Sequence, residues 1–211
     1  MSETMTLAAA AAATSTGDVW LFRGKSPADR AIRLFTNSPV NHVSMVVALD
    51  DLPPLLWHAE LGQSLTDVWT ATRHRGAQLH RLEHAVSVWV HTYGQKAWFR
   101  QIDRTVTPEM EDTILATVAE FSGRAFPRTG ALAKRWLLGR IRRGVPLEDL
   151  YCAELVATTY ERIGLLEARR PANWYDPGKF WSGDRLDLVG ATLGPEIQIT
   201  DIPPPPGDDQ R

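Results

Sequence analysis

The single cysteine of this 211-residue chain is the residue best suited to nucleophilic chemistry. Cys152 opens a segment in which apolar residues recur at three- and four-residue spacing, which predicts an amphipathic helix ending at Gly164. With Asp149 as the cap, Cys152 lies in the first turn, where free backbone N–H groups and the helix dipole favour a thiolate. The alternative is a structural role, because Cys152 shares a face with Leu155 and Val156, and free cysteine is commonly buried as a small apolar residue.

Two histidines are candidates for the base that activates the Cys152 thiol and for the group that orients that base. Residues 41–48 and 55–60 have the composition of strands, and the short turn-rich link between them predicts an antiparallel hairpin. His42 lies at the start of the first strand and His58 near the end of the second, so the two imidazoles meet if they face the same side. Glu60 shares the parity of His58 and competes for its role. A thiol, an imidazole and an orienting polar group are the parts of a cysteine hydrolase.

The other four histidines are not candidates for the site. Their polar or alternating surroundings indicate solvated positions for His74, His80, His84 and His91. The sequence contains no two-histidine-plus-carboxylate spacing of a known kind. We therefore predict neither a metal site nor a cofactor.

Composition predicts one globular domain. The chain is 44% hydrophobic and 23% charged, with a formal net charge of −2, which argues against a nucleic-acid-binding surface. One cysteine excludes an intrachain disulfide framework and fits a reducing cytoplasm. No window approaches the ~18 to 20 apolar residues of a membrane span. We predict disordered tails at residues 1–16 and 203–211 and a single domain over 17–202.

Other elements follow from the same signals. We predict a strand at 19–22, a helix opening at Ser26-Pro27, and a helix running from Thr107 to Phe121. A basic amphipathic stretch, Lys134 to Arg143, predicts either a helix docked on the core or a peripheral contact with an anionic membrane. Further strands are predicted around 68–69, 78–80, 86–90, 97–100, 186–189 and 197–199.

A run of short motifs resembles the NlpC/p60 papain-like superfamily. The motifs are Gly17-Asp18-Val19-Trp20-Leu21-Phe22, then Asn41-His42-Val43-Ser44-Met45-Val46-Val47, then Trp57-His58-Ala59, and last Tyr151-Cys152-Ala153-Glu154-Leu155-Val156. In the cell-wall peptidases of that superfamily the cysteine helix precedes the strands. Here it follows them, which is similar to the circularly permuted branch of YiiX-like and lecithin–retinol acyltransferase-like proteins. The resemblance spans roughly residues 17 to 190.

The resemblance implies a fold and a site. The fold would be α+β, with an antiparallel sheet packed against helices that include the cysteine helix. Cys152 would be the nucleophile, His42 the base and His58 the orienting group, with the Cys152 N–H as oxyanion donor. Many YiiX-like proteins have Glu at the position of His58, which keeps Glu60 as the alternative third member. Asn41 and Ala153 stand where serines are more usual.

Three functions remain open on this sequence. The first is a thiol hydrolase or acyltransferase that forms an acyl-enzyme on an amide, ester or thioester, including one in a lipid. The second is a peptidase or amidase that cleaves peptide or isopeptide bonds. The third is a binding domain that keeps the fold without the chemistry, and a wide separation of Cys152 from His42 would favour it.

Overall fold

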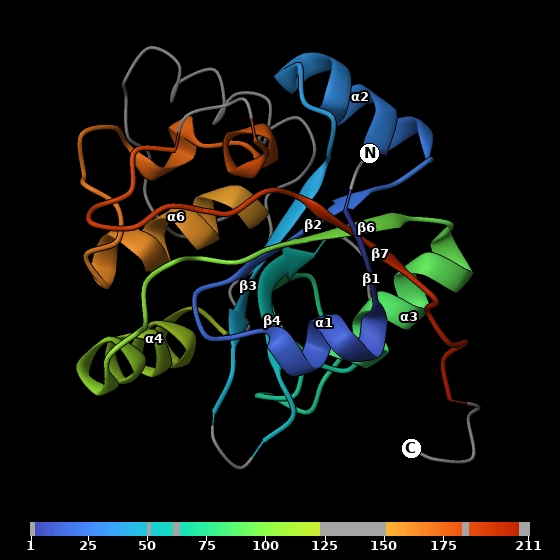
Figure 1. The fold of residues 1–211 in the computed structure, drawn as a ribbon, viewed down its shortest axis with the longest axis horizontal. Coiled ribbons are helices and arrows are strands. Elements are labelled where there is room, and N and C mark those ends of the chain that lie inside the picture. Colours follow the sequence, from blue (N-terminus) through green and yellow to red (C-terminus); the bar gives the residue numbers. More distant parts are fainter. Residues whose placement is uncertain (1–2, 50–51, 61–63, 123–150, 183–185, 207–211) are drawn as a thin grey trace.

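The computed structural model describes residues 3–49, 52–60, 64–122, 151–182 and 186–206, and these form one sheet covered by helices on both faces (Figure 1). The sheet has seven strands in the order β1-β7-β6-β2-β3-β4-β5. All pairs are antiparallel except β1 with β7, which is parallel. The strands are β1 (Thr4–Thr6), β2 (Val19–Arg23), β3 (His42–Val47), β4 (Leu55–Glu60), β5 (Gly76–Arg81), β6 (Lys96–Arg100) and β7 (Ile197–Thr200). The predicted α+β class is confirmed.

The two faces of the sheet carry separate cores. One core packs under α4 (Pro108–Phe121), α6 (Cys152–Arg162) and the 3-10 turns Ala172–Trp174 and Pro177–Phe180. The other packs under α1 (Leu7–Ala13) and α3 (Leu82–Tyr93). Because neighbouring strand residues point to opposite faces, each strand contributes alternate side chains to the two cores. This division decides which candidate site residues can meet.

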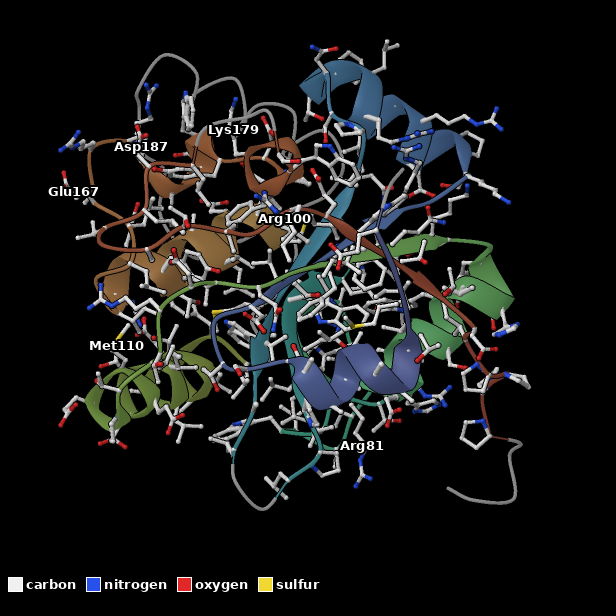
Figure 2. All side chains as sticks on the ribbon, in the orientation of Figure 1. Arg81, Arg100, Met110, Glu167, Lys179 and Asp187 are labelled. Atoms are coloured by element: carbon white, nitrogen blue, oxygen red, sulfur yellow. The ribbon has the colours of Figure 1, made fainter. Side chains whose placement is uncertain are left out.

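Helix α6 is the centre of the first core. Leu155 and Tyr160 are fully buried, and the indole Nε1 of Trp57 in β4 donates to Thr159 Oγ1 at 3.1 Å. Arg100 fixes the C-terminal segment beside this core, since its guanidinium donates to the backbone oxygens of Phe180 at 2.6 Å and Leu193 at 2.9 Å (Figure 2). The helix is therefore held by packing and by buried polar contacts together.

Leu155→Ala tests how much the packing of α6 in this core contributes to the free energy of unfolding. The side chain is 0% exposed, and removing it leaves a cavity in a close-packed region, so we expect the free energy of unfolding to fall by about 2 to 5 kcal/mol. Leu52→Ala is the matched control, because Leu52 is 56% exposed and its loss should change that free energy by no more than about 0.5 kcal/mol. Chemical denaturation of both variants measures the difference, and equal effects would contradict the assigned core.

Several predicted elements differ from the structure. Residues 86–90 were predicted as a strand but lie in α3, where Leu82, Val86 and Trp89 form the buried stripe of a helix. A disordered tail was predicted over 1–16, whereas β1 extends the sheet and α1 buries Leu7 and Ala10. The segment around 68–69 is a turn, and Leu188 forms a single bridge with Leu166.

Other predictions agree with the structure or fall outside it. The strand at 19–22, the antiparallel pair β3 and β4, and the helix that Thr107 caps are confirmed. The basic stretch at 134–143, predicted as a docked helix or a membrane contact, and the predicted cap Asp149 lie outside the described residues. Tyr151 occupies the cap position of α6 and makes no side-chain capping bond, because its hydroxyl donates to the backbone oxygen of Asn173 at 2.9 Å. Within the described residues, no helix has the length and apolar character needed to cross a membrane.

Candidate functional site

Three histidines from adjacent strands gather on the face of the sheet that α3 covers. His42 begins β3, His58 lies in β4 and His80 lies in β5. In the β4–β5 register His58 lies opposite Gln78 and Leu56 lies opposite His80, so all four side chains share one face. The sequence left open whether His42 and His58 face the same side; the structure places both on this face, and His80 joins them.

Trp89 of α3 encloses this cluster. His58 Nε2 and His80 Nδ1 are 2.8 Å apart and share a hydrogen bond. The ring centres of His42 and His58 are 5.1 Å apart in an edge-to-face arrangement. The indole of Trp89 lies 4.9 Å from the His58 ring and 5.6 Å from the His42 ring, edge-to-face in both cases. The tryptophan therefore excludes water from the side of α3 and fixes the rings in place.

Burial keeps these imidazoles neutral. His58 is 0% exposed and His80 is 2% exposed. Burial, followed by repulsion from His80, lowers the pKa of His42 to about 4, and burial lowers that of His80 to about 4. Burial, with repulsion from His80 and His42, holds the pKa of His58 well below its usual value. At neutral pH each ring has a nitrogen lone pair, the form in which histidine binds metals.

Glu60 brings a carboxylate to the same face. It ends β4, two residues after His58, and its Oε1 accepts hydrogen bonds from Ser64 Oγ at 2.6 Å and Ser64 N at 3.2 Å. Burial raises the pKa of Glu60. Glu60 and His42 are the two partly exposed members of the group, so the cluster meets solvent at these residues.

The cluster contains several buried polar atoms without a hydrogen-bond partner. They are His42 Nε2, His58 Nδ1, His80 Nε2, Glu60 Oε2 and Gln78 Oε1. A buried polar atom left without a partner costs about 1 to 3 kcal/mol, so native proteins usually satisfy such atoms with an ordered water, an ion or another ligand. One ligand atom from each of His58, Glu60 and His80 lies within 4.8 Å of the other two. Two imidazoles and a carboxylate are a zinc-type ligand set.

Cys152 lies on the other face of the sheet. It begins α6, is 7% exposed, and belongs to the core that contains Val43 and Leu155. The nearby backbone N–H of Val43 lowers the pKa of the thiol, but burial outweighs this effect and raises that pKa to about 11. Val43 and His42 are successive strand residues, so their side chains point to opposite faces. The structure thus brings His42, His58 and Glu60 together and does not bring Cys152 to them.

His80 is the site residue that the sequence analysis missed. It was assigned to a solvated position, whereas the structure buries it between β4 and α3. A signal was present, because residues 78–80 were predicted as a strand and an imidazole on a buried strand face needs a polar partner. What was lacking was the pairing of β5 with β4, which local sequence does not encode.

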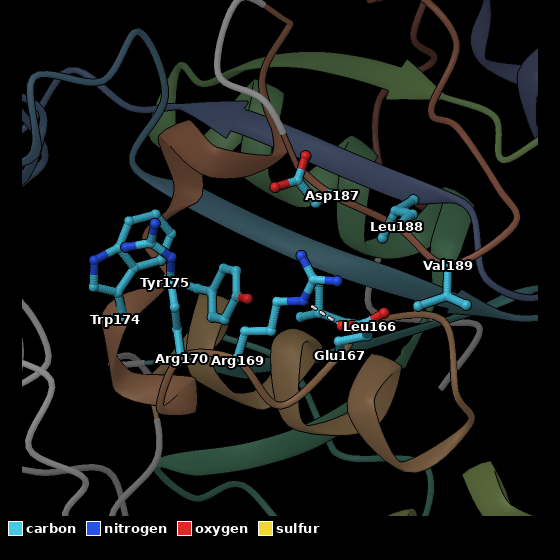
Figure 3. Close-up of a pocket in the computed structure, with 9 residues that line it drawn as sticks. All are labelled: Leu166, Glu167, Arg169, Arg170, Trp174, Tyr175, Asp187, Leu188 and Val189. Atoms are coloured by element: carbon cyan, nitrogen blue, oxygen red, sulfur yellow. Dashed lines mark hydrogen bonds and ion pairs between the residues drawn. The ribbon is translucent and has the colours of Figure 1, made fainter.

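A separate cavity lies beyond the C-terminal end of α6 (Figure 3). Its volume is about 170 Å³, and its walls come from residues 166–175 and 187–189. The guanidinium of Arg170 stacks on Trp174 at 4.0 Å, and Arg169 is paired with Glu167. None of the predicted site residues lines this cavity.

Comparison with known proteins finds likenesses among solved structures but none among protein families or curated proteins. No protein-family model matches the sequence, and no curated protein matches it significantly. Among solved structures, the chain is similar to the crystal structure of the metalloprotein yiiX from Escherichia coli O157:H7, with a TM-score of 0.47 and 18% identity. The match covers 71% of this chain and 66% of that chain, which is slightly less than two thirds of the yiiX chain. The function of this chain must therefore be inferred from its own residues.

Proposed function

We propose that this domain binds a divalent transition metal of the zinc type through His58, His80 and Glu60. The observation that carries the proposal is the convergence of three ligand-type side chains, each of which places one ligand atom within 4.8 Å of the other two. Neutral imidazole and carboxylate suit Zn²⁺, and Trp89 supplies the apolar enclosure that strengthens such a site. Ligand atoms around a tetrahedral Zn²⁺ lie about 3.4 Å apart, given metal–ligand distances of ~2.0 to 2.1 Å, so binding would require side-chain rotations that open the hydrogen bond between His58 Nε2 and His80 Nδ1.

Three protein ligands define the kind of metal site. Zinc held by three side chains keeps a fourth position for water or substrate and supplies hydrolytic chemistry there. His42 lies beside the three ligands, with its ring centre 5.1 Å from that of His58, and its Nε2 has no partner. His42 can therefore accept a hydrogen bond from a molecule at the open position. The proposed activity is a metal-dependent hydrolysis for which His42 positions the reactant.

Zinc titration of chelator-treated protein tests the proposal. We expect one equivalent of Zn²⁺ to bind per chain in calorimetry and to raise the thermal midpoint of unfolding, since a ligand of the folded state stabilises it. Mg²⁺ should not compete, because it prefers oxygen ligands. Absence of stoichiometric binding, or equal binding by Mg²⁺, would refute the assignment.

A papain-like cysteine hydrolase is the second candidate. It would use Cys152 as nucleophile, His42 as base, and His58 or Glu60 to orient the base, and would act on an amide, ester, thioester or peptide bond. The observation in its favour is that Cys152 opens α6 and that its sulfur lies close enough to the N–H of Val43, the residue after His42, for that group to lower the thiol pKa. It requires the imidazole of His42 to reach the α6 face, whereas that ring packs toward Trp89.

Alkylation of Cys152 separates the two candidates. With its pKa raised to about 11, the thiol should react with iodoacetamide at pH 8 at least about 100-fold more slowly than a free cysteine, in parent and His42→Ala alike. The rate is measured by mass spectrometry of native protein against pH, with unfolded protein as the reference. Fast alkylation below pH ~8.5 that is lost in His42→Ala would instead establish the cysteine hydrolase.

A further inference from the structure

Helix α2 (Pro27–Thr36) presents an apolar face to solvent. No residue of this helix is fully buried, and its two largest apolar side chains, Leu34 and Phe35, are 80% and 74% exposed. The helix stands at the rim of the sheet, between the end of β2 and the start of β3 (Figure 1). Large adjacent apolar residues exposed to this degree mark a contact surface more often than a folding requirement.

Helix α2 is held in place by contacts that do not involve Leu34 or Phe35. Ser26 and Asp29 form a capping box at its N-terminus. Asn41 links this turn to the sheet, since its Nδ2 donates to Asp29 Oδ1 at 2.9 Å and its Oδ1 accepts from Gly24 N at 2.6 Å. The half-buried residues of the helix are Asp29, Ile32, Arg33 and Thr36. Leu34 and Phe35 are therefore held outward on a positioned helix.

Positive charge surrounds the apolar pair. Lys25 and Arg30 are exposed, and Arg33 is half-buried with an unpartnered Nε. The single acid of the helix, Asp29, is engaged by Ser26 and Asn41. Throughout the described part of the chain, no carboxylate forms an ion pair with these cations. Arg33 also lies close enough to Arg23 to reinforce the lowering of the Arg23 pKa by burial. The helix thus offers unneutralised cations beside exposed leucine and phenylalanine.

We propose that α2 is a docking surface for an anionic lipid membrane, with Leu34 and Phe35 entering the headgroup region. Cations flanking an apolar helical face are the pattern of interfacial helices, which combine burial of apolar area with attraction to anionic lipid. A second copy of the chain fits less well, because a symmetric contact would bring Arg30 and Arg33 against their own counterparts. The helix is short, so the contact is reversible and peripheral.

Vesicle sedimentation tests this surface with the full chain. We expect binding to phosphatidylcholine vesicles that contain phosphatidylglycerol, weaker binding in high salt, and little binding to phosphatidylcholine alone. The double variant Leu34→Ser/Phe35→Ser should lose about tenfold or more of the binding. Val68→Ser/Trp69→Ser is the matched control, because Val68 and Trp69 are 46% and 49% exposed and do not belong to α2, and it should bind as the parent does.

Three results would overturn the proposal. These are absence of binding to anionic vesicles, equal binding by the parent and the Leu34→Ser/Phe35→Ser variant, and equal loss in both double variants. Light scattering of the free protein tests the alternative occupant, a second copy of the chain. A dimer that the Leu34→Ser/Phe35→Ser variant abolishes would assign the face to self-association. Circular dichroism confirms that both variants are folded.

Discussion

His58→Gln and His80→Gln are each expected to weaken Zn²⁺ binding by at least about 100-fold. Removal of residues that only orient ligands already costs 10- to 100-fold in metal affinity, and these two histidines are proposed as ligands themselves. Glutamine is similar in volume and polar, so the substitution removes the imidazole without leaving a large cavity. Calorimetric titration of chelator-treated variants measures the dissociation constants.

His91→Gln is the matched control for those variants. His91 is exposed on α3 and its Nε2 lies 2.8 Å from the backbone oxygen of Ile202, so its loss removes a histidine without touching the cluster. The control should bind Zn²⁺ with the affinity of the parent. A loss in His91→Gln as large as in the two ligand variants would show that Zn²⁺ binds surface histidines and would reject the site.

Acid should destabilise the metal-free protein through the same histidines. The pKa of His80 is lowered from 6.5 to about 4 in the folded state, so the unfolded chain binds a proton first as the pH falls. Its stabilising contribution is therefore complete above pH ~6.5 and is lost as the pH falls toward 4. At 1.36 kcal/mol per unit, this single group makes the free energy of unfolding about 3 kcal/mol lower at pH 4 than at pH 7.

His80→Gln identifies the source of that acid sensitivity. Denaturant unfolding of the parent and the variant at a series of pH values between 4 and 7 gives the two slopes. The variant should show the shallower dependence, because glutamine does not titrate. Added Zn²⁺ should steepen the dependence in the parent, since protons compete with the metal for the imidazoles. Identical slopes in the parent and the variant would contradict the buried neutral state of His80.

Sequence patterns predicted the parts of the fold that local rules govern. Strand alternation and the short link placed His42 and His58 on a hairpin, and Glu60 on the face of His58, as the structure has them. Helical spacing predicted α6 with Cys152 at its start. These features depend on residues near one another in the chain, so the sequence contains enough information to fix them.

Other features depended on contacts that no local pattern encodes. Val86, Val88 and Val90 alternate as in a strand, but Leu82 and Trp89 give the same segment a helical stripe that buries against the sheet. The role of His80 required the pairing of β5 with β4. The separation of Cys152 from the histidines required the packing of α6 against the face opposite α3. Parity within one hairpin does not say which helix covers which face.

X-ray absorption at the zinc edge of protein loaded with one equivalent of Zn²⁺ tests the central claim most directly. Ligation by His58, His80 and Glu60 predicts a first shell of nitrogen and oxygen at ~2.0 to 2.1 Å, with the imidazole signature of two histidines and no sulfur. The imidazole signature should disappear from the double variant His58→Gln/His80→Gln. A zinc–sulfur distance of ~2.3 Å would instead assign the metal to Cys152. A first shell of oxygen atoms alone would assign it to surface carboxylates or water. Either spectrum would contradict the histidine site.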